Sequence, residues 1–249
     1  METPEELSHP RVFVLLPCYN EEKSIEELLE RTSHVLGNIK FTIVAVDDGS
    51  TDGTLKLLER VRSIYPLVIS RHQINMGLHV ALHTGLMKIM EMSSLSDLVI
   101  VMDSDLTHDP IYIRDILSKL NEGFDVVIAS RYTKGGRQIG LPIHRIVLSR
   151  VACSLMKHLF AFSVEDVTSG FRGYKTKTLK RIVRRYGKKF INSQGFEVMV
   201  ELLIKAKKTG ARITEIPILL DYSKKKNASK MRILNTVIGY ARLAKKMYK

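Results

Sequence analysis

The chain has 249 residues, of which 45% are hydrophobic, so it can bury one sizeable core, and we expect a single domain over residues 1–249. Its apolar runs are far shorter than the roughly 20 residues of a membrane-spanning helix, and its acidic N-terminus lacks the pattern of a secretory signal, so neither a span nor export is expected. Cys18 and Cys153 show no metal-binding or redox spacing, which favours a reducing compartment.

The net charge of +13 hides an asymmetry between the two halves of the chain. Residues 1–129 hold 11 Lys and Arg against 20 Asp and Glu, whereas residues 130–249 hold 28 against 6. The acidic half suits metal binding, while the basic half suits phosphate groups, an anionic membrane surface or nucleic acid. Charge alone leaves these partners open.

Short apolar runs alternate with amphipathic segments over the first half of the chain. Apolar runs that end in turn residues predict buried strands at 12–16, 41–46, 67–70, 97–102 and 125–129. Apolar residues at helical spacing predict helices at 24–36, 54–64, 79–92 and 111–120. This alternation predicts an α/β fold with a mostly parallel sheet and helices on both faces.

The alternation weakens after residue 130, where two longer helices are expected. Residues 145–160 place Val147, Val151 and Leu155 at helical spacing between basic residues, and residues 233–249 carry another apolar stripe with a Lys-rich end. Each helix is expected either to lie on a membrane surface or to pack on the core with a solvated basic face.

Polar motifs follow the first four predicted strands, at residues 17–21, 47–53, 75–77 and 103–109. Ligands of parallel α/β sheets bind outside the carboxyl ends of the strands, so these motifs are expected to converge on one pocket. Asp48 is expected to reach a base or ribose there, while residues 50–52 cap the next helix.

Asp103 and Asp105 follow an apolar strand with one residue between them. An Asp-x-Asp pair often only decorates a turn, but a pair at a strand end can hold Mg²⁺ or Mn²⁺ against a diphosphate. The sequence contains no glycine motif that would cradle phosphates, so metal and basic side chains are expected to hold the diphosphate instead.

Seven short motifs occur in a fixed order along the chain: LPCYNE at 16–21, VDDGS at 46–50, NMG at 75–77, DSDL at 103–106, SRY at 130–132, TSGFR at 168–172 and SKM at 229–231. Their order and spacing over roughly residues 11–245 resemble the family-2 glycosyltransferases. The resemblance is greatest to the dolichyl-phosphate mannose synthase group, which are polyprenyl-phosphate glycosyltransferases.

This resemblance implies a GT-A fold and an inverting enzyme that needs Mg²⁺ or Mn²⁺. The implied reaction moves a hexose from a nucleotide sugar, with GDP-mannose favoured and UDP-glucose or another UDP-sugar as the alternative, to a polyprenyl or dolichyl phosphate. The product would be a lipid-linked sugar donor for glycosylation. Residues 1–129 would form the nucleotide-sugar and metal half, and residues 130–249 the acceptor and membrane-facing half.

Family roles transfer to this chain by position. The resemblance implies nucleotide-sugar contacts from Pro17, Tyr19, Glu21, Asp48, Asn75, Gly77, Asp103, Ser104 and Lys230. It implies metal binding by Asp103 and Asp105, acceptor-phosphate binding by Arg131, Arg145 and Ser149, and catalytic roles for Asp105, Arg131 and Arg145. Forked arginine donors suit a phosphate nucleophile, which is already anionic and needs little help from a general base.

The chain departs from the family pattern before Ser229, where Lys224 and Asn227 stand in for the usual Arg and Gly. It resembles the members without C-terminal membrane helices, so we expect a protein peripheral to the cytoplasmic side of a membrane, with a membrane-embedded partner subunit as a plausible companion.

Three rival interpretations stay open. A sugar-hydroxyl acceptor would need a general base, for which Glu197 is the only weak candidate. A nucleic-acid binder fits the high pI, but the basic residues are not interleaved with stacking aromatics and the conspicuous motifs are acidic, so no nucleic acid is expected as a partner. A regulatory chain with a dead active site disagrees with the intact Asp103 and Asp105 pair.

Overall fold

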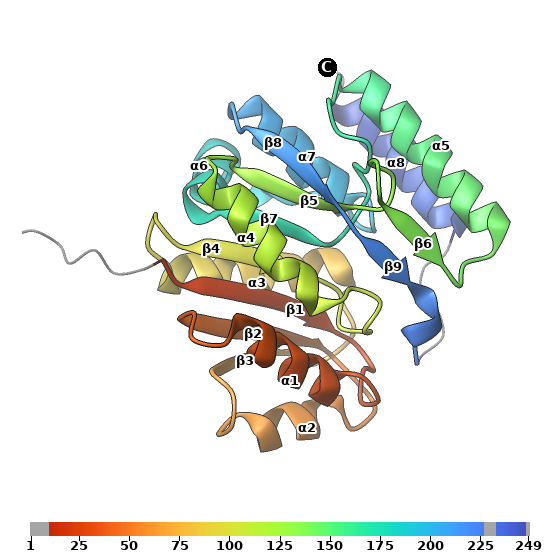
Figure 1. The fold of residues 1–249 in the computed structure, drawn as a ribbon. Coiled ribbons are helices and arrows are strands. Elements are labelled where there is room, and N and C mark those ends of the chain that lie inside the picture. The colour runs from red at the N-terminus through yellow and green to blue at the C-terminus, as the bar shows by residue number, and fades with distance from the viewer. Residues whose placement is uncertain (1–9, 227–232, 248–249) are drawn as a thin grey trace, which may run out of the picture.

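A computed structural model describes residues 10–226 and 233–247, and these residues form an α/β fold around one large sheet (Figure 1). The strands of this sheet are β1 (Val12–Cys18), β2 (Phe41–Asp48), β3 (Leu67–His72), β4 (Leu98–Val101), β5 (Val126–Ser130), β7 (Arg172–Lys175) and β8 (Ile213–Pro217). Their order is β3-β2-β1-β4-β7-β5-β8. β7 runs antiparallel to β4 and β5, and the other pairs are parallel.

The helices are α1 (Ile25–Leu36), α2 (Thr54–Val61), α3 (Leu78–Met92), α4 (Ile113–Asn121), α5 (Ile143–Leu159), α6 (Thr176–Tyr186), α7 (Val198–Lys208) and α8 (Ile233–Met247). Single 3₁₀ turns lie at Pro110–Tyr112, Gly187–Lys189 and Tyr222–Lys224. A second small sheet pairs β6 (Arg137–Ile139) with β9 (Leu219–Asp221) in parallel. α5 packs beside α8, outside the main sheet (Figure 1).

Each strand and helix expected in the first half is present, with ends shifted by a few residues, and so are the two later helices. The prediction of a mostly parallel α/β sheet is therefore confirmed. The sequence analysis missed β6, β7, β8, β9, α6 and α7. Within residues 10–226 and 233–247, no helix has both the length and the apolar character to cross a bilayer.

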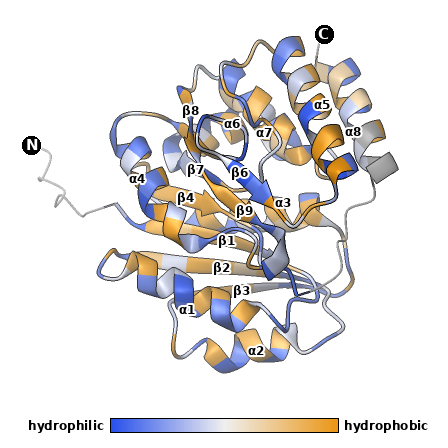
Figure 2. Ribbon diagram, turned by 45° about the vertical axis from the view of Figure 1, so that its right-hand side comes forward, coloured by the Kyte–Doolittle hydropathy of each residue, from blue (hydrophilic) through white to orange (hydrophobic). Residues whose placement is uncertain are grey.

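Alternation along the central strands builds a core on each face of the sheet. Val12 and Val14 of β1 pack into the cluster that contains the buried sides of α1 and α4. Phe13 and Leu15 point the other way, into the cluster shared with α3, α6 and α7. The central strands are mostly hydrophobic along their length (Figure 2), as expected of parallel strands covered on both faces.

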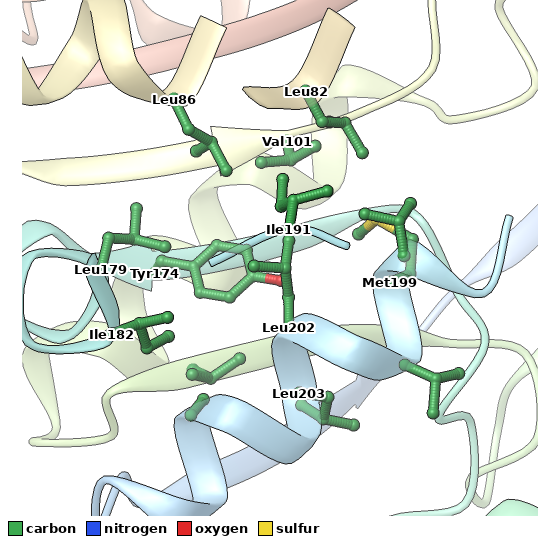
Figure 3. Close-up of a cluster of buried hydrophobic side chains, with 14 of the residues drawn as sticks. Leu82, Leu86, Val101, Tyr174, Leu179, Ile182, Ile191, Met199, Leu202 and Leu203 are labelled. Atoms are coloured by element: carbon green, nitrogen blue, oxygen red, sulfur yellow. The ribbon is translucent and has the colours of Figure 1, made fainter. Parts of the chain in front are cut away.

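The cluster under α3 joins elements that are far apart in the sequence. Figure 3 shows Leu82 and Leu86 of α3 above Tyr174 of β7, with Leu179 of α6 and Leu202 of α7 closing the cluster around it. These contacts fix the position of β7 between β4 and β5, and thereby the loop that leads into it.

Arg172 at the start of β7 is fully buried and bonds to three backbone carbonyls in two segments. Its Nε donates to Ser169 at 2.8 Å, its Nη2 donates to Val167 at 2.7 Å, and its Nη1 donates to Met199 at the start of α7. A buried guanidinium is stable only where its donors find such acceptors. Arg172 therefore ties the loop before β7 to α7.

Replacing Arg172 by Met should lower the free energy of unfolding by about 3 kcal/mol, because three buried carbonyls lose their donor. Urea unfolding measures this, with Arg184→Met on the exposed face of α6 as the matched control. The control should change stability by less than about 0.5 kcal/mol. Equal effects of the two substitutions would show that Arg172 has no special structural role.

Candidate active site

A cavity of about 640 Å³ opens where the carboxyl ends of the central strands meet α5. The expectation that four strand-end motifs converge on one pocket agrees with this geometry. All of the predicted site residues that the structure describes line the cavity: Pro17, Tyr19, Glu21, Asp48, Asn75, Gly77, Asp103, Ser104, Asp105, Arg131, Arg145 and Ser149. Lys230 lies outside the described residues. The individual roles of these residues stay predictions.

The loop that follows β1 is joined to its neighbours by short hydrogen bonds. The hydroxyl of Ser104 donates to the carbonyl of Pro17 at 2.9 Å, which connects the ends of β4 and β1. The backbone N–H of Glu21 donates to Oγ1 of Thr54 at 2.8 Å, and its carboxylate accepts from the hydroxyl of Ser24 at 3.0 Å. Glu21 is therefore held in place at the edge of the cavity.

Asp48 uses both carboxylate oxygens to shape the loop after β3. Oδ1 bonds to Nδ1 of His72 at 2.7 Å and accepts from the N–H of Met76 at 2.9 Å. Oδ2 accepts from Nδ2 of Asn75 at 3.1 Å and from the N–H of Gly77 at 2.8 Å. The expected contact of Asp48 with a base or ribose stays a prediction, and the structure adds a positioning role that the sequence analysis did not foresee.

Asp105 is held by a tight turn just after β4. Its Oδ1 accepts from the N–H of Thr107 at 3.1 Å and from Oγ1 of Thr107 at 2.6 Å, and its Oδ2 accepts from Nζ of Lys225. Leu106, between the two, is buried and has a φ of +65°, a left-handed conformation that costs energy for a branched residue. The surrounding packing thus fixes the carboxylate direction.

The two acidic residues of the pair have different electrostatic surroundings. Partial desolvation in the cavity, together with the charge of Asp105, raises the pKa of Asp103, although His108 works against this. Burial alone would also raise the pKa of Asp105, but the charge and hydrogen bond of Lys225 outweigh it and bring that pKa below its ordinary value. Asp105 is therefore the more strongly ionised member of the pair.

This pair fits a metal that is shared with a phosphate ligand. In the part of the chain that the structure describes, no three His, Cys, Asp or Glu side chains gather as a metal site. Asp103 is nevertheless 45% exposed at the cavity, beside the fixed Asp105. Mg²⁺ usually takes one or two protein carboxylates and fills its other positions with water and substrate phosphates, so two carboxylates suffice.

Arg131, at the end of β5, is locked against a fully buried carboxylate. Its Nε and Nη2 donate to the two oxygens of Asp166 at 2.6 and 2.7 Å, and its backbone N–H donates to Oδ2 at 3.0 Å. Nη2 also donates to the hydroxyl of Thr168 at 2.9 Å. Three of the five side-chain N–H donors of Arg131 are therefore engaged, and the other two belong to Nη1.

Arg145 and Ser149 add a second cation and a hydroxyl to the lining of the same cavity. They lie four residues apart on α5 and so share one face of that helix. The hydroxyl of Tyr132 donates to Oγ of Ser149 at 2.8 Å, which leaves the Ser149 proton available to a ligand. Arg131 stacks on the Tyr132 ring, with 4.7 Å between Cζ and the ring centroid.

The sequence analysis missed several residues of the site. Asp166 could have been noticed, because it is one of only 6 acidic residues after residue 129. His72 and Lys225 gave no such signal, since a lone histidine and one lysine among three are ordinary in a sequence. Their importance follows only from contacts with Asp48 and Asp105.

Asp166→Asn should lower the free energy of unfolding at pH 7 by about 3 kcal/mol, because the buried Arg131 loses its counter-ion. Burial alone would raise the pKa of Asp166, but Arg131 holds it below the ordinary value. The stabilisation is therefore complete above the unfolded pKa of about 3.9 and is lost as the pH falls through the folded pKa. Urea unfolding between pH 7 and pH 3 should show the difference from wild type shrinking at the acid end. A difference that stays constant would contradict this.

Comparisons with known proteins agree with this geometry. Residues 13–183 match the family model described as Glycosyl transferase family 2. The chain is 30% identical to a dolichol-phosphate mannosyltransferase of Pyrococcus furiosus over 83% of this chain and 55% of the relative, so it spans little more than half of that protein. It is 28% identical to a polyprenol monophosphomannose synthase of Mycolicibacterium smegmatis over 84% of this chain and 76% of the relative.

Solved structures share the fold at lower sequence identity. Glucosyl-3-phosphoglycerate synthase of Mycobacterium tuberculosis, in a complex with Mn²⁺, uridine diphosphate and glucosyl-3-phosphoglycerate, superposes with a TM-score of 0.65 at 19% identity. The match covers 96% of this chain and 78% of the synthase. The same enzyme in complex with phosphoglyceric acid gives a TM-score of 0.63. This likeness confirms the expected GT-A fold.

Proposed function

The chain belongs to glycosyl transferase family 2, and from that premise we propose that it transfers mannose from GDP-mannose to the phosphate of a polyprenyl lipid such as dolichyl phosphate. The sugar and the lipid follow the names of the two relatives, a dolichol-phosphate mannosyltransferase and a polyprenol monophosphomannose synthase. The proposal includes dependence on a divalent metal and inversion at the anomeric carbon.

One observation carries this proposal: a single cavity is lined by a carboxylate pair together with two arginines and a serine. Asp103 and Asp105 would hold the donor diphosphate through Mg²⁺ or Mn²⁺, which when bound neutralises the charge of the departing nucleoside diphosphate. Nη1 of Arg131, the guanidinium of Arg145 and the hydroxyl of Ser149 supply donors for an acceptor phosphate.

These residues suit a displacement that needs no general base. A phosphate monoester is already mostly ionised at neutral pH. One of its oxygens forms a bond to the anomeric carbon while the bond from that carbon to the diphosphate oxygen breaks, and the nucleoside diphosphate leaves with the electron pair. Attack from the face opposite the diphosphate inverts the anomeric carbon. Arg131 and Arg145 orient the nucleophile, and the rigid Asp166 pair keeps Arg131 in place.

Glu197, the candidate base for a hydroxyl acceptor, is not among the described residues that line the cavity. Its Oε1 accepts from the N–H of Gln194 at 3.2 Å. Its Oε2 lies only 2.5 Å from where a Cβ would stand at Gly239 of α8, so the carboxylate is packed against that helix. Among the described residues, the carboxylates that line the cavity are Glu21, Asp48, Asp103 and Asp105, which lie at or just after the ends of β1, β2 and β4. This favours a phosphate acceptor.

α5 supports the proposal that the protein docks on the cytoplasmic side of a membrane. Ile143, Val147, Val151 and Leu155 recur every four residues along it, and each is at least half exposed. The same helix turns Arg145 and Ser149 into the cavity. An apolar ridge that enters the acyl boundary would leave the lipid tail in the bilayer while its phosphate reaches the arginines.

The reaction is tested by following radiolabelled sugar from GDP-mannose, UDP-glucose and UDP-N-acetylglucosamine into organic-extractable lipid, with dolichyl phosphate and Mn²⁺. We expect transfer from GDP-mannose, abolished by chelator and lowered at least about 100-fold in Asp105→Asn, because a charge-stabilising group is lost. Ile64→Asp is the control and should keep wild-type activity. Transfer from a UDP-sugar alone would overturn the donor, and nucleotide binding without any lipid product would overturn the acceptor.

Val151→Asp should weaken binding to phospholipid vesicles at least about tenfold, because a charge then faces the acyl boundary. Sedimentation with vesicles measures this, and Ile64→Asp provides the matched control, since Ile64 is 70% exposed but lies beyond α2, away from the cavity. Equal binding by wild type and Val151→Asp would contradict docking through α5.

A further inference from the structure

Lys225 places its ammonium group on Asp105, one of the two carboxylates proposed to bind the metal. Its Nζ donates to Oδ2 of Asp105, and the side chains are only 18% and 9% exposed. Lys225 is therefore a cation in the wall of the cavity, paired with Asp105.

The two neighbouring lysines make different contacts. Lys224 donates to Asp109 at 3.1 Å, and Lys226 donates to Glu27 at 2.9 Å. Both pairs are substantially exposed, with lysine side chains 39% and 44% accessible, so each contributes little to stability. Lys225 is the member of this run that reaches the cavity, and Lys226 offers a matched surface control.

We propose that Lys225 is a donor-site residue that exchanges between two anions, Asp105 and the diphosphate of the nucleotide sugar. This rests on the proposed function, because it takes Asp105 as a metal-binding residue. A divalent cation and an ammonium group on the same carboxylate repel each other, so each weakens the binding of the other. A lysine ammonium can move on its flexible four-carbon stem, and it is a good partner for phosphate oxygens.

The exchange couples the metal to the nucleotide. With no diphosphate present, Lys225 competes with the cation for Asp105 and weakens metal binding. With a diphosphate in the cavity, the displaced ammonium gains a new anion, and its charge adds to that of the metal. Lys225 therefore lowers the affinity for the metal alone and raises the affinity for the metal and the nucleotide together. This is positive coupling between the two ligands. It would also hold the leaving group during transfer.

The test measures binding rather than turnover. Mn²⁺ affinity is determined by electron paramagnetic resonance for wild type, Lys225→Met, Lys225→Arg and Lys226→Met. The affinity for GDP and for UDP is then measured by calorimetry at saturating Mn²⁺. Relative to wild type, Lys225→Met should bind Mn²⁺ alone about tenfold more tightly and the nucleoside diphosphate about tenfold more weakly, which is the size of one charge-assisted hydrogen bond. Lys226→Met should change each affinity less than about twofold.

The outcomes separate this inference from the proposed function. If wild type binds Mn²⁺ and Asp105→Asn does not, but Lys225→Met matches wild type, the exchange is overturned while the metal site stands. If wild type binds no Mn²⁺, or Asp105→Asn binds it equally well, the metal assignment falls and the exchange with it. Lys225→Arg keeps the charge and should stay nearer to wild type than Lys225→Met in both titrations. Circular dichroism of each variant verifies that it is folded.

Discussion

The parallel pairing of β3, β2, β1 and β4 is the constraint that brings the carboxylates of the cavity together. Parallel strands end at the same edge of a sheet, so residues more than fifty positions apart in the sequence, such as Asp48 and Asp105, line one cavity. The apolar strands supply the burial that holds these ends rigid. Acidic side chains can then stand close together, because hydrogen bonds from neighbouring loops hold them in place.

Arg131 in the wall of the cavity is positioned in a different way. β7 runs against its neighbours, and the loop before it brings Asp166 under Arg131, where the pair is almost completely buried. Asp166 is not one of the carboxylates proposed to bind the donor, yet it fixes one of the two arginines proposed to bind the acceptor. The uneven charge of the two halves of the chain therefore meets in one cavity, which carboxylates from the first half and guanidinium groups from the second half line together.

The sequence predicted those parts of the fold whose signals are local. β1, β2 and β5 are continuous apolar runs, and α1 and α4 have a regular apolar face, so each appears in the sequence pattern. β7 escaped prediction because its four residues, RGYK, show neither an apolar run nor alternation, and its pairing comes from the sheet on both sides. In the site, motif positions located the cavity lining. The Arg131 and Asp166 pair and the Lys225 contact join residues 35 and 120 positions apart, which no local pattern encodes.

Under the proposed function, the carboxylates and the arginines of the cavity bind different substrates, and steady-state kinetics of Arg145→Met test this most directly. The account predicts that the KM for polyprenyl phosphate rises about tenfold or more, because a charge-assisted contact is lost, while the KM for the nucleotide sugar stays within about twofold. Arg184→Met on α6 serves as the control for loss of one positive charge. A rise in the KM for the nucleotide sugar, with the KM for the lipid phosphate unchanged, would contradict the assignment of the carboxylates to the donor and of the arginines to the acceptor.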